Sequence, residues 1–357
     1  MRDVRTPRGK PPHMKRPAPS ALYDWSMAVA SLWASGGILL DAWHHFHSTV
    51  ETYFEWSHAV LAAGLLAAFV FTGIAVRHFH RQGYPWDRAL PDGYDWTLSG
   101  LGVFLLGVVL DMIKHTLWGF EQGFNALLSV THLMIGAGIV LMIAGPIRSA
   151  MLRERQPRTL VEQLPMILSL ASLIELIHWG TQFVYLSEAE SMNAPLNPGL
   201  FPHDTFTLLA LLYYKQGIGL LAVIVQSLLM VGPALYIARR VTLAPGALTV
   251  LFFTGNLFIA LVHSNYPGQF LAVIAASLIA GALGDWLRPN AAATATRWGL
   301  AAFVMPASYW TVMLVVLAVT MNGIWWSPDV ITGSVVMAGA AGLFVNMLTS
   351  PPAPARA

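Results

Sequence analysis

Residues 58–76 read HAVLAAGLLAAFVFTGIAV, a stretch without a single Asp, Glu, Lys or Arg. A run of about 20 apolar residues is long enough to cross the roughly 30 Å hydrocarbon core of a bilayer as a helix. Because lipid offers the backbone no hydrogen-bond partner, a helix is the expected form of such a run. The stretch therefore predicts a transmembrane helix, and the rest of the chain repeats its pattern.

The chain as a whole has the composition of a membrane protein. Of its 357 residues 56% are hydrophobic and only 11% are charged, whereas soluble domains are roughly 25% charged. We predict an all-α, polytopic integral membrane bundle of about ten spans. The predicted spans are 21–48, 58–76, 96–118, 129–147, 164–186, 213–238, 247–263, 269–287, 299–321 and 331–349. Because the run 205–238 is too long for one upright span, we expect residues 200–212 to form an interfacial lead-in.

The basic residues lie on alternate connections between these spans. The two termini and every second link carry 18 of the 20 Lys and Arg residues, and the intervening links carry none. Positively charged loops stay on the cytoplasmic side of a membrane. We therefore predict that both termini are cytoplasmic and that the number of spans is even. The expected location is the inner (cytoplasmic) membrane of a bacterium.

The predicted organisation has four parts. Residues 1–20 form a basic, disordered tail, 21–148 two helical hairpins, 149–350 about six further spans, and 351–357 a tail. The chain has no Cys, which excludes disulfides and thiolate metal sites. It shows no phosphate loop, dinucleotide-binding glycine pattern or nucleophile elbow. We therefore expect the lipid bilayer, and no nucleic acid, as a partner.

The two hairpins repeat one pattern of ligand-type residues, Asp-x3-His-x5-Glu followed by a His that opens the next span. The pattern comprises Asp41, His45, Glu51 and His58, and then Asp111, His115, Glu121 and His132. An Asp and a His four residues apart share one helix face, so both can reach one ion. The hairpin returns a second His at the same depth. Each set suits copper, zinc or non-haem iron, with the Glu as a loop ligand or a neighbour of the ligands.

Other interpretations of these residues stay open. A buried Asp–His hydrogen bond between helices would explain one hairpin, but the recurrence of the same offsets favours metal. Both hairpins present the same side of the membrane, so the repeat is parallel. Glu55 is a further acidic residue beside the first hairpin. Glu175 and His178 share a face of the fifth span, as either additional ligands or a structural pair.

Residues 41–58 resemble the ligand hairpin of the C subunit of copper membrane monooxygenases, the particulate methane and ammonia monooxygenases. That motif has Asp-x3-His, an acidic residue six beyond the His, a Phe and a closing Ser-His. Here Glu51, Phe54, Ser57 and His58 stand in that register. Residues 111–132 resemble the subunit's second motif, and the matching residues are His115, Trp118, Glu121, Ser129 and His132. The resemblance implies copper ligands at Asp41, His45 and His58, and at Asp111, His115 and His132.

The resemblance covers residues 40–145, under a third of the chain, and it has departures. Asp111 stands where the family has Asn, and the family's gap before the second His is shorter. Residues 150–357 have no counterpart. The chain also lacks the cupredoxin-like domain of the family's partner subunit, so such a periplasmic protein, or other membrane subunits, are candidate partners.

Three functions are compatible with these features. The first is a copper-binding membrane protein, as a monooxygenase-type oxidoreductase acting on a small apolar substrate. The second is a metal transporter or metal-delivery protein, and the third is a structural membrane subunit. A transporter needs polar residues that continue toward the cytoplasm, and Asp285 is the main ionisable residue in the inner halves of the spans. We therefore favour a one-sided metal site toward the non-cytoplasmic face.

Overall fold

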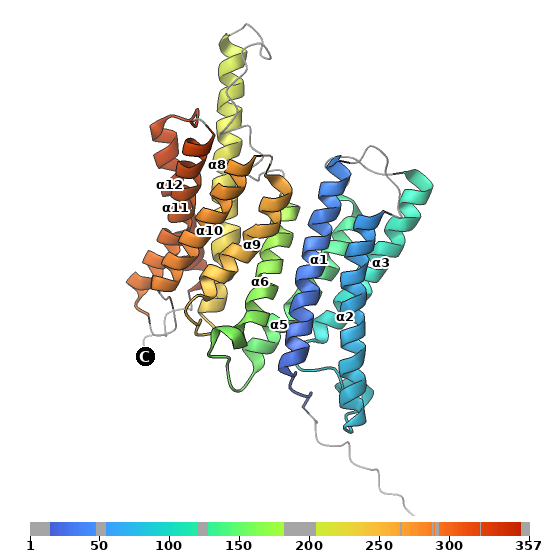
Figure 1. Cartoon of the computed structure of the whole chain (residues 1–357). Coiled ribbons are helices and arrows are strands. Elements are labelled where there is room, and N and C mark those ends of the chain that lie inside the picture. The colour runs from blue at the N-terminus through green and yellow to red at the C-terminus, as the bar shows by residue number, and fades with distance from the viewer. Residues whose placement is uncertain are drawn as a thin grey trace, which may run out of the picture.

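A computed structural model describes residues 15–47, 55–119, 128–181, 205–264, 266–287, 289, 293–321 and 323–350. These residues form ten α-helices and one short 3-10 helix, without a strand among them. The helices run side by side along a common direction (Figure 1). The predicted all-α class is thereby confirmed.

The helices follow the apolar runs closely. The first four are α1 (Ala21–His47), α2 (Trp56–Arg81), α3 (Asp95–Trp118) and α5 (Val130–Leu152), with the 3-10 helix η1 (Trp86–Arg88) before α3. The others are α6 (Leu160–Gly180), α8 (Thr205–Ala238), α9 (Ala247–His263), α10 (Pro267–Leu287), α11 (Ala295–Thr320) and α12 (Pro328–Thr349). Side-chain hydroxyls cap four helix N-termini, which supplies acceptors for otherwise unpaired N–H groups. These caps are Ser129, Thr159, Thr294 and Ser327.

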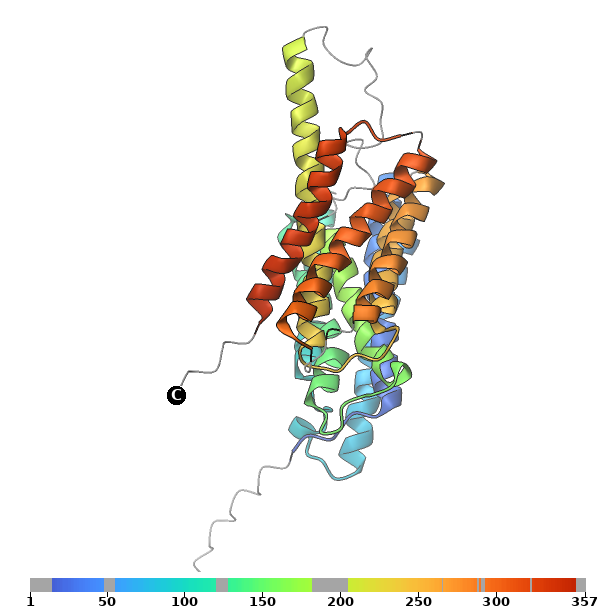
Figure 2. The same cartoon turned by 90° about the vertical axis from the view of Figure 1, so that its left-hand side faces the viewer.

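Eight of these helices are long and apolar enough to cross a membrane. The other two are α9, which has 17 residues, and α1, which has 27 residues but carries Asp24 and Asp41. The chain is therefore a multi-pass membrane protein, while the count of ten spans stays a prediction. Helix α1 begins and α12 ends at the same end of the bundle (Figure 2), as an even number of crossings requires.

Helix α8 is longer than its predicted span. It is a continuous helix of 34 residues from Thr205, and its part that is long and apolar enough to cross a membrane is Leu212–Ala238, close to the predicted 213–238. Residues 205–216 contain neither Pro nor Gly, and nothing in that stretch interrupts a helix. The first turns of α8 project beyond the ends of the neighbouring helices (Figures 1 and 2).

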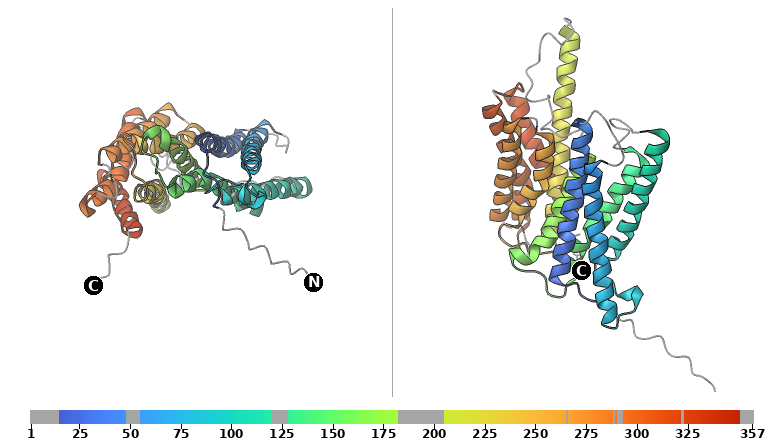
Figure 3. Two further views of the ribbon diagram at one scale, coloured as in Figure 1. Left: turned by 90° about the horizontal axis from the view of Figure 1, so that it is seen from below. Right: turned by 45° about the vertical axis from the view of Figure 1, so that its right-hand side comes forward.

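The bundle is elongated when it is viewed along the helices. Helices α1, α2, α3 and α5 lie on one side, α10, α11 and α12 lie on the other, and α6 lies between them (Figure 3). One continuous hydrophobic core joins the two sides, from Tyr23 in α1 to Val345 in α12. Helix α1 contacts α2, α5, α6 and α9. The helix that bears the first ligand pair is therefore also part of the central packing.

A buried polar network joins α1, α3 and α5 where the chain enters the bundle. The carboxylate of Asp24 accepts hydrogen bonds from the Tyr94 hydroxyl at 2.6 Å and from Ser149 at 3.1 Å. It also pairs with Arg153. Burial raises the pKa of Tyr94 well above its usual value, so the hydroxyl keeps its proton and remains a donor. This network connects the lower ends of the helices whose other ends carry the repeated ligand pattern.

Candidate metal centre

The first hairpin brings Asp41, His45 and His58 together. Asp41 and His45 lie in the last turns of α1, and His58 lies in the first turn of α2. The Nε2 atom of His45 lies 3.6 Å from Asp41 Oδ2, and that of His58 lies 3.3 Å from Asp41 Oδ1. One ligand atom from each residue lies within 4.8 Å of the other two. This spacing, on a buried carboxylate, could hold a metal ion.

The second hairpin repeats this arrangement with α3 and α5. The Nε2 atom of His115 lies 3.1 Å from Asp111 Oδ2, and Nδ1 of His132 lies 3.8 Å from Asp111 Oδ1. The ligand atoms of this set also lie within 4.8 Å of one another. The side chains of both Asp111 and His115 are only 7% exposed. We call the two sets the first and the second triad, and the convergence predicted for each is confirmed.

Hydrogen bonds determine which nitrogen of His115 faces Asp111. The Nδ1 atom lies 3.2 Å from the carbonyl oxygen of Gly119. A carbonyl can only accept a hydrogen bond, so Nδ1 carries the proton. The Nε2 atom lies on the side of Asp111, so it is the nitrogen that an ion held beside that carboxylate would meet. An imidazole that donates one N–H to a carbonyl and offers its other nitrogen is the usual state of a metal-bound His.

A chain of hydroxyl groups orients His132 in the second triad. Thr131 Oγ1 donates to Asp111 Oδ1 at 2.6 Å and lies 3.0 Å from Ser129 Oγ, which lies 2.6 Å from His132 Nδ1. Because Thr131 uses its only hydrogen on Asp111, the hydrogen between the hydroxyls belongs to Ser129. Ser129 Oγ therefore accepts from Nδ1 of His132. Nδ1 is also the nitrogen that lies 3.8 Å from Asp111 Oδ1, so an ion bound by Nδ1 would replace the hydrogen donated to Ser129.

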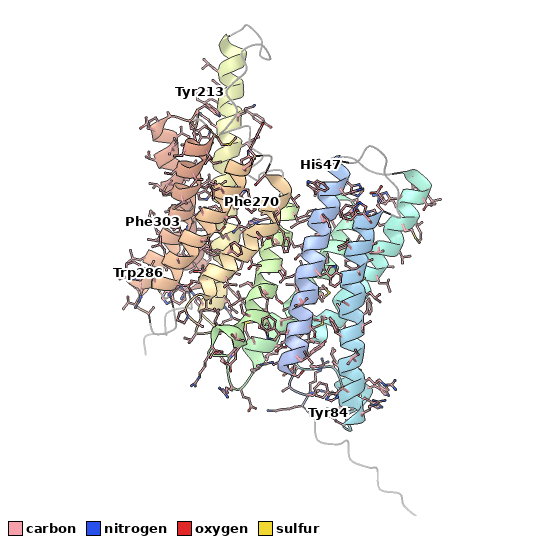
Figure 4. All side chains as sticks on the ribbon, viewed as in Figure 1. His47, Tyr84, Tyr213, Phe270, Trp286 and Phe303 are labelled. Atoms are coloured by element: carbon pink, nitrogen blue, oxygen red, sulfur yellow. The ribbon has the colours of Figure 1, made fainter. Side chains whose placement is uncertain are left out.

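Both triads lie at the same end of the bundle. His47, just beyond the first triad in α1, lies at the top of that helix in Figure 4, and α3 ends and α5 begins at this level (Figure 1). Helix α1 contacts α5. The two triads therefore share one region of the protein.

A second His–carboxylate pair lies beside the first triad. The Nδ1 atom of His44 lies 2.8 Å from Glu55 Oε2, and both side chains are largely buried. The rings of His44 and His45 have centroids 6.3 Å apart. Glu55 lies near the first triad, as expected. It pairs with His44, which is not part of the repeated pattern. Glu51 and Glu121, predicted to point toward the triads, lie outside the described residues.

Glu175 and His178 belong to neither triad. Both are buried in α6, and the Glu175 carboxylate accepts hydrogen bonds from the backbone N–H groups of Phe258 and Ile259 in α9, at 2.9 and 3.0 Å. His178 lines a narrow space with Gln226, Asn256 and Tyr309. Glu175 therefore joins α6 to α9.

Asp285 has a structural role. Its carboxylate accepts hydrogen bonds from the N–H groups of Leu248 and Thr249 at 3.1 and 3.0 Å and from the Thr249 hydroxyl at 2.6 Å. These groups lie at the N-terminus of α9, where an anionic acceptor is favourable. The main ionisable residue in the inner halves of the spans therefore caps a helix.

Sequence reasoning did not identify Thr131, and it named Glu55 without its pairing to His44. Thr131 differs from other helix threonines only by its place one residue before a ligand His. The pairing of His44 with Glu55 depends on how α1 and α2 cross.

No known family model, curated protein sequence or solved structure matches this chain. The resemblance to the copper monooxygenase subunit, and the functions it implies, therefore stay predictions.

Proposed function

We propose that this protein is a membrane-embedded copper-binding protein that holds one ion in each Asp–His–His triad. The observation that carries the proposal is the repetition of one arrangement: two separate pairs of helices each bring a carboxylate and two imidazoles within 4.8 Å. A structural Asp–His contact explains one such set. It does not explain why the same offsets recur with a third ligand from the next helix in both hairpins.

The donor chemistry supports a transition metal. Imidazole suits copper, zinc and iron, while carboxylate adds negative charge that favours a divalent ion. Copper is our choice because of the resemblance of both motifs. Bound copper would supply redox chemistry toward dioxygen. We extend the proposal to a monooxygenase-type oxidation of a small apolar substrate, with electrons supplied by a partner such as a periplasmic cupredoxin-like protein.

The proposal includes an orientation. Arg148 and Arg153 lie at the end of α5 opposite to His132, and Arg239 follows the end of α8. If this basic end faces the cytoplasm, as positively charged loops do, the triads face the outer side. Ten spans with both termini inside would then hold. Transport is disfavoured because Asp285 is engaged with the N-terminus of α9.

Metal analysis of the purified protein tests the proposal. The protein is reconstituted in nanodiscs, loaded with Cu(II), washed, and measured by mass spectrometry of the metal and by electron paramagnetic resonance. We expect one copper per triad, with nitrogen hyperfine structure from imidazole. His58→Ala and His132→Ala should each lose one equivalent. His78→Ala is the matched control, because His78 lies at the other end of α2 and contacts Gln82.

Two results would contradict the proposal. Copper retained in full by both His58→Ala and His132→Ala would exclude the triads as the sites. Zinc as the only metal retained from a mixture would exclude oxidation, because zinc has no redox chemistry. Copper released across the membrane of sealed vesicles would favour the transporter instead.

A further inference from the structure

The second half of the chain has almost no acidic residues. Between residues 205 and 350 the sequence contains two, Asp285 and Asp329. Asp329 lies in the first turn of α12, at the end of the bundle that carries the triads. Asp285 lies at the opposite, basic end, but its carboxylate is bound to the N-terminus of α9. Within residues 205–350, the described part of the basic end therefore offers no free carboxylate to its arginines.

Among the described residues, three arginines at this end bond to neutral groups. Arg239 donates to Asn346 Oδ1 at 2.6 Å and to Ser350 Oγ at 3.0 Å. Its guanidinium carbon lies 4.1 Å above the Trp298 ring. Burial lowers the pKa of Arg239, as expected of a cation held partly out of water.

The other two arginines are exposed and are similarly placed. Arg240 lies 3.6 Å above the Tyr236 ring and donates to the carbonyl of the same residue at 3.2 Å. Arg297 precedes Trp298 and donates to the carbonyl of Leu287 at the end of α10. Within the part of the chain that the structure describes, none of the three arginines forms an ion pair with a carboxylate.

Two arginines of the first half at this end are neutralised within the protein. Arg148 pairs with Asp95 at 3.1 Å, and Arg153 pairs with Asp24. Both pairs lie at the same end of the bundle as the three unpaired arginines. The positive-inside pattern alone therefore does not explain the difference, since it places arginines without deciding whether they are neutralised within the protein.

We propose that Arg239, Arg240 and Arg297 bind the phosphates of anionic phospholipid headgroups at this end of the bundle. A guanidinium matches two phosphate oxygens with parallel hydrogen bonds, and clusters of basic residues at helix ends on the cytoplasmic side bind anionic headgroups. The adjoining helix surfaces are apolar: Leu300 is 50% exposed and Met347 is 74% exposed. Acyl chains can lie there while the phosphate meets the arginines. The site is independent of the metal proposal.

The test measures lipid binding to the intact protein in detergent. Phosphatidylglycerol is titrated against phosphatidylcholine and followed by native mass spectrometry. We expect the wild type to retain phosphatidylglycerol preferentially. Each of Arg240→Gln and Arg297→Gln should weaken that binding about five-fold, which corresponds to roughly 1 kcal/mol per arginine near an anionic surface. Arg88→Gln is the matched control, because Arg88 lies at the same end and pairs with Asp87.

Arg239 is tested by Arg239→Lys, which keeps the charge but loses the planar fork, because Arg239→Gln would also loosen the contact with α12. We expect intermediate binding. Equal retention of the two lipids, or equal loss in Arg88→Gln and Arg297→Gln, would overturn the proposal. Displacement of the lipid by millimolar inorganic phosphate, with the same dependence on the arginines, would assign the site to free phosphate and overturn the lipid as its ligand.

Discussion

Replacement of Gly138 by alanine tests how α3 and α5 hold the second triad. A Cβ atom at Gly138 would lie 2.6 Å from the backbone nitrogen of Phe104 and 2.7 Å from its Cβ. The first distance is about 0.8 Å short of the 3.4 Å at which ordinary contact begins, so the two helices must separate by nearly that amount. Overpacking of this kind typically destabilises a protein by about 1–3 kcal/mol.

The matched control is Gly136→Ala. It lies two residues earlier in α5, and no atom lies within 4 Å of a Cβ built there. Alanine is favoured over glycine inside a helix by about 1 kcal/mol, so Gly136→Ala should leave stability unchanged or raise it slightly. The difference between the two variants isolates the packing effect from helix propensity.

Both variants are compared by thermal unfolding in detergent, followed by circular dichroism. We expect Gly138→Ala to unfold several degrees below Gly136→Ala. It should also bind copper more weakly at the second triad alone, because separation of α3 from α5 lengthens the 2.6 Å hydrogen bond between Thr131 and Asp111. Equal melting temperatures for the two variants would refute the close crossing of α3 and α5.

Three further outcomes are expected. Thr131→Val should lower copper affinity at the second triad by about 10–100-fold, as loss of a group that orients a ligand usually does. The control is Thr116→Val, which removes a hydroxyl that bonds only within its own helix. Equal copper affinities of the two variants in a titration would contradict the role of Thr131. Asp285→Asn should destabilise the protein by about 1–2 kcal/mol, because the capping charge at α9 is lost; an unchanged thermal midpoint would argue against it. Because the chain has no native Cys, single cysteines introduced at Gln82 and Ser327 can be labelled directly in intact cells. We expect a membrane-impermeant maleimide to label only position 327. Labelling of position 82 instead would reverse the proposed orientation.

The sequence by itself determined the helical class and the composition of the ligand sets. An apolar run of membrane length allows only a helix, because no other structure pairs its own backbone groups in lipid. The offset between Asp41 and His45 is local, since one helical turn places them on one face. The same holds for Asp111 and His115. The third ligand of each triad, His58 or His132, also follows from the sequence. It opens the next helix after a short connection, so it lies at the same end of the bundle as the Asp–His pair.

Only the tertiary structure decided which neighbours complete these sets. Thr131 donates to Asp111 because α3 and α5 cross closely, and His44 meets Glu55 because α1 ends against the start of α2. Helix periodicity states which face a residue occupies, but not which helix that face meets. The tertiary structure likewise showed that α8 is one continuous helix through residue 212. The usual length of a single span does not indicate whether a helix continues beyond it.

The charges show the same division. The sequence places basic residues at one end of the bundle, but it does not indicate which of them are neutralised. Asp24 pairs with Arg153, 129 residues away, whereas Asp285 binds the N-terminus of α9 and Arg239 donates to the neutral side chain of Asn346. Pairing over such separations depends on the packing of whole helices, since a charge interacts strongly only with groups a few ångströms away in space. The sequence therefore determined the kinds of groups at each end, and the tertiary structure decided which of them act together.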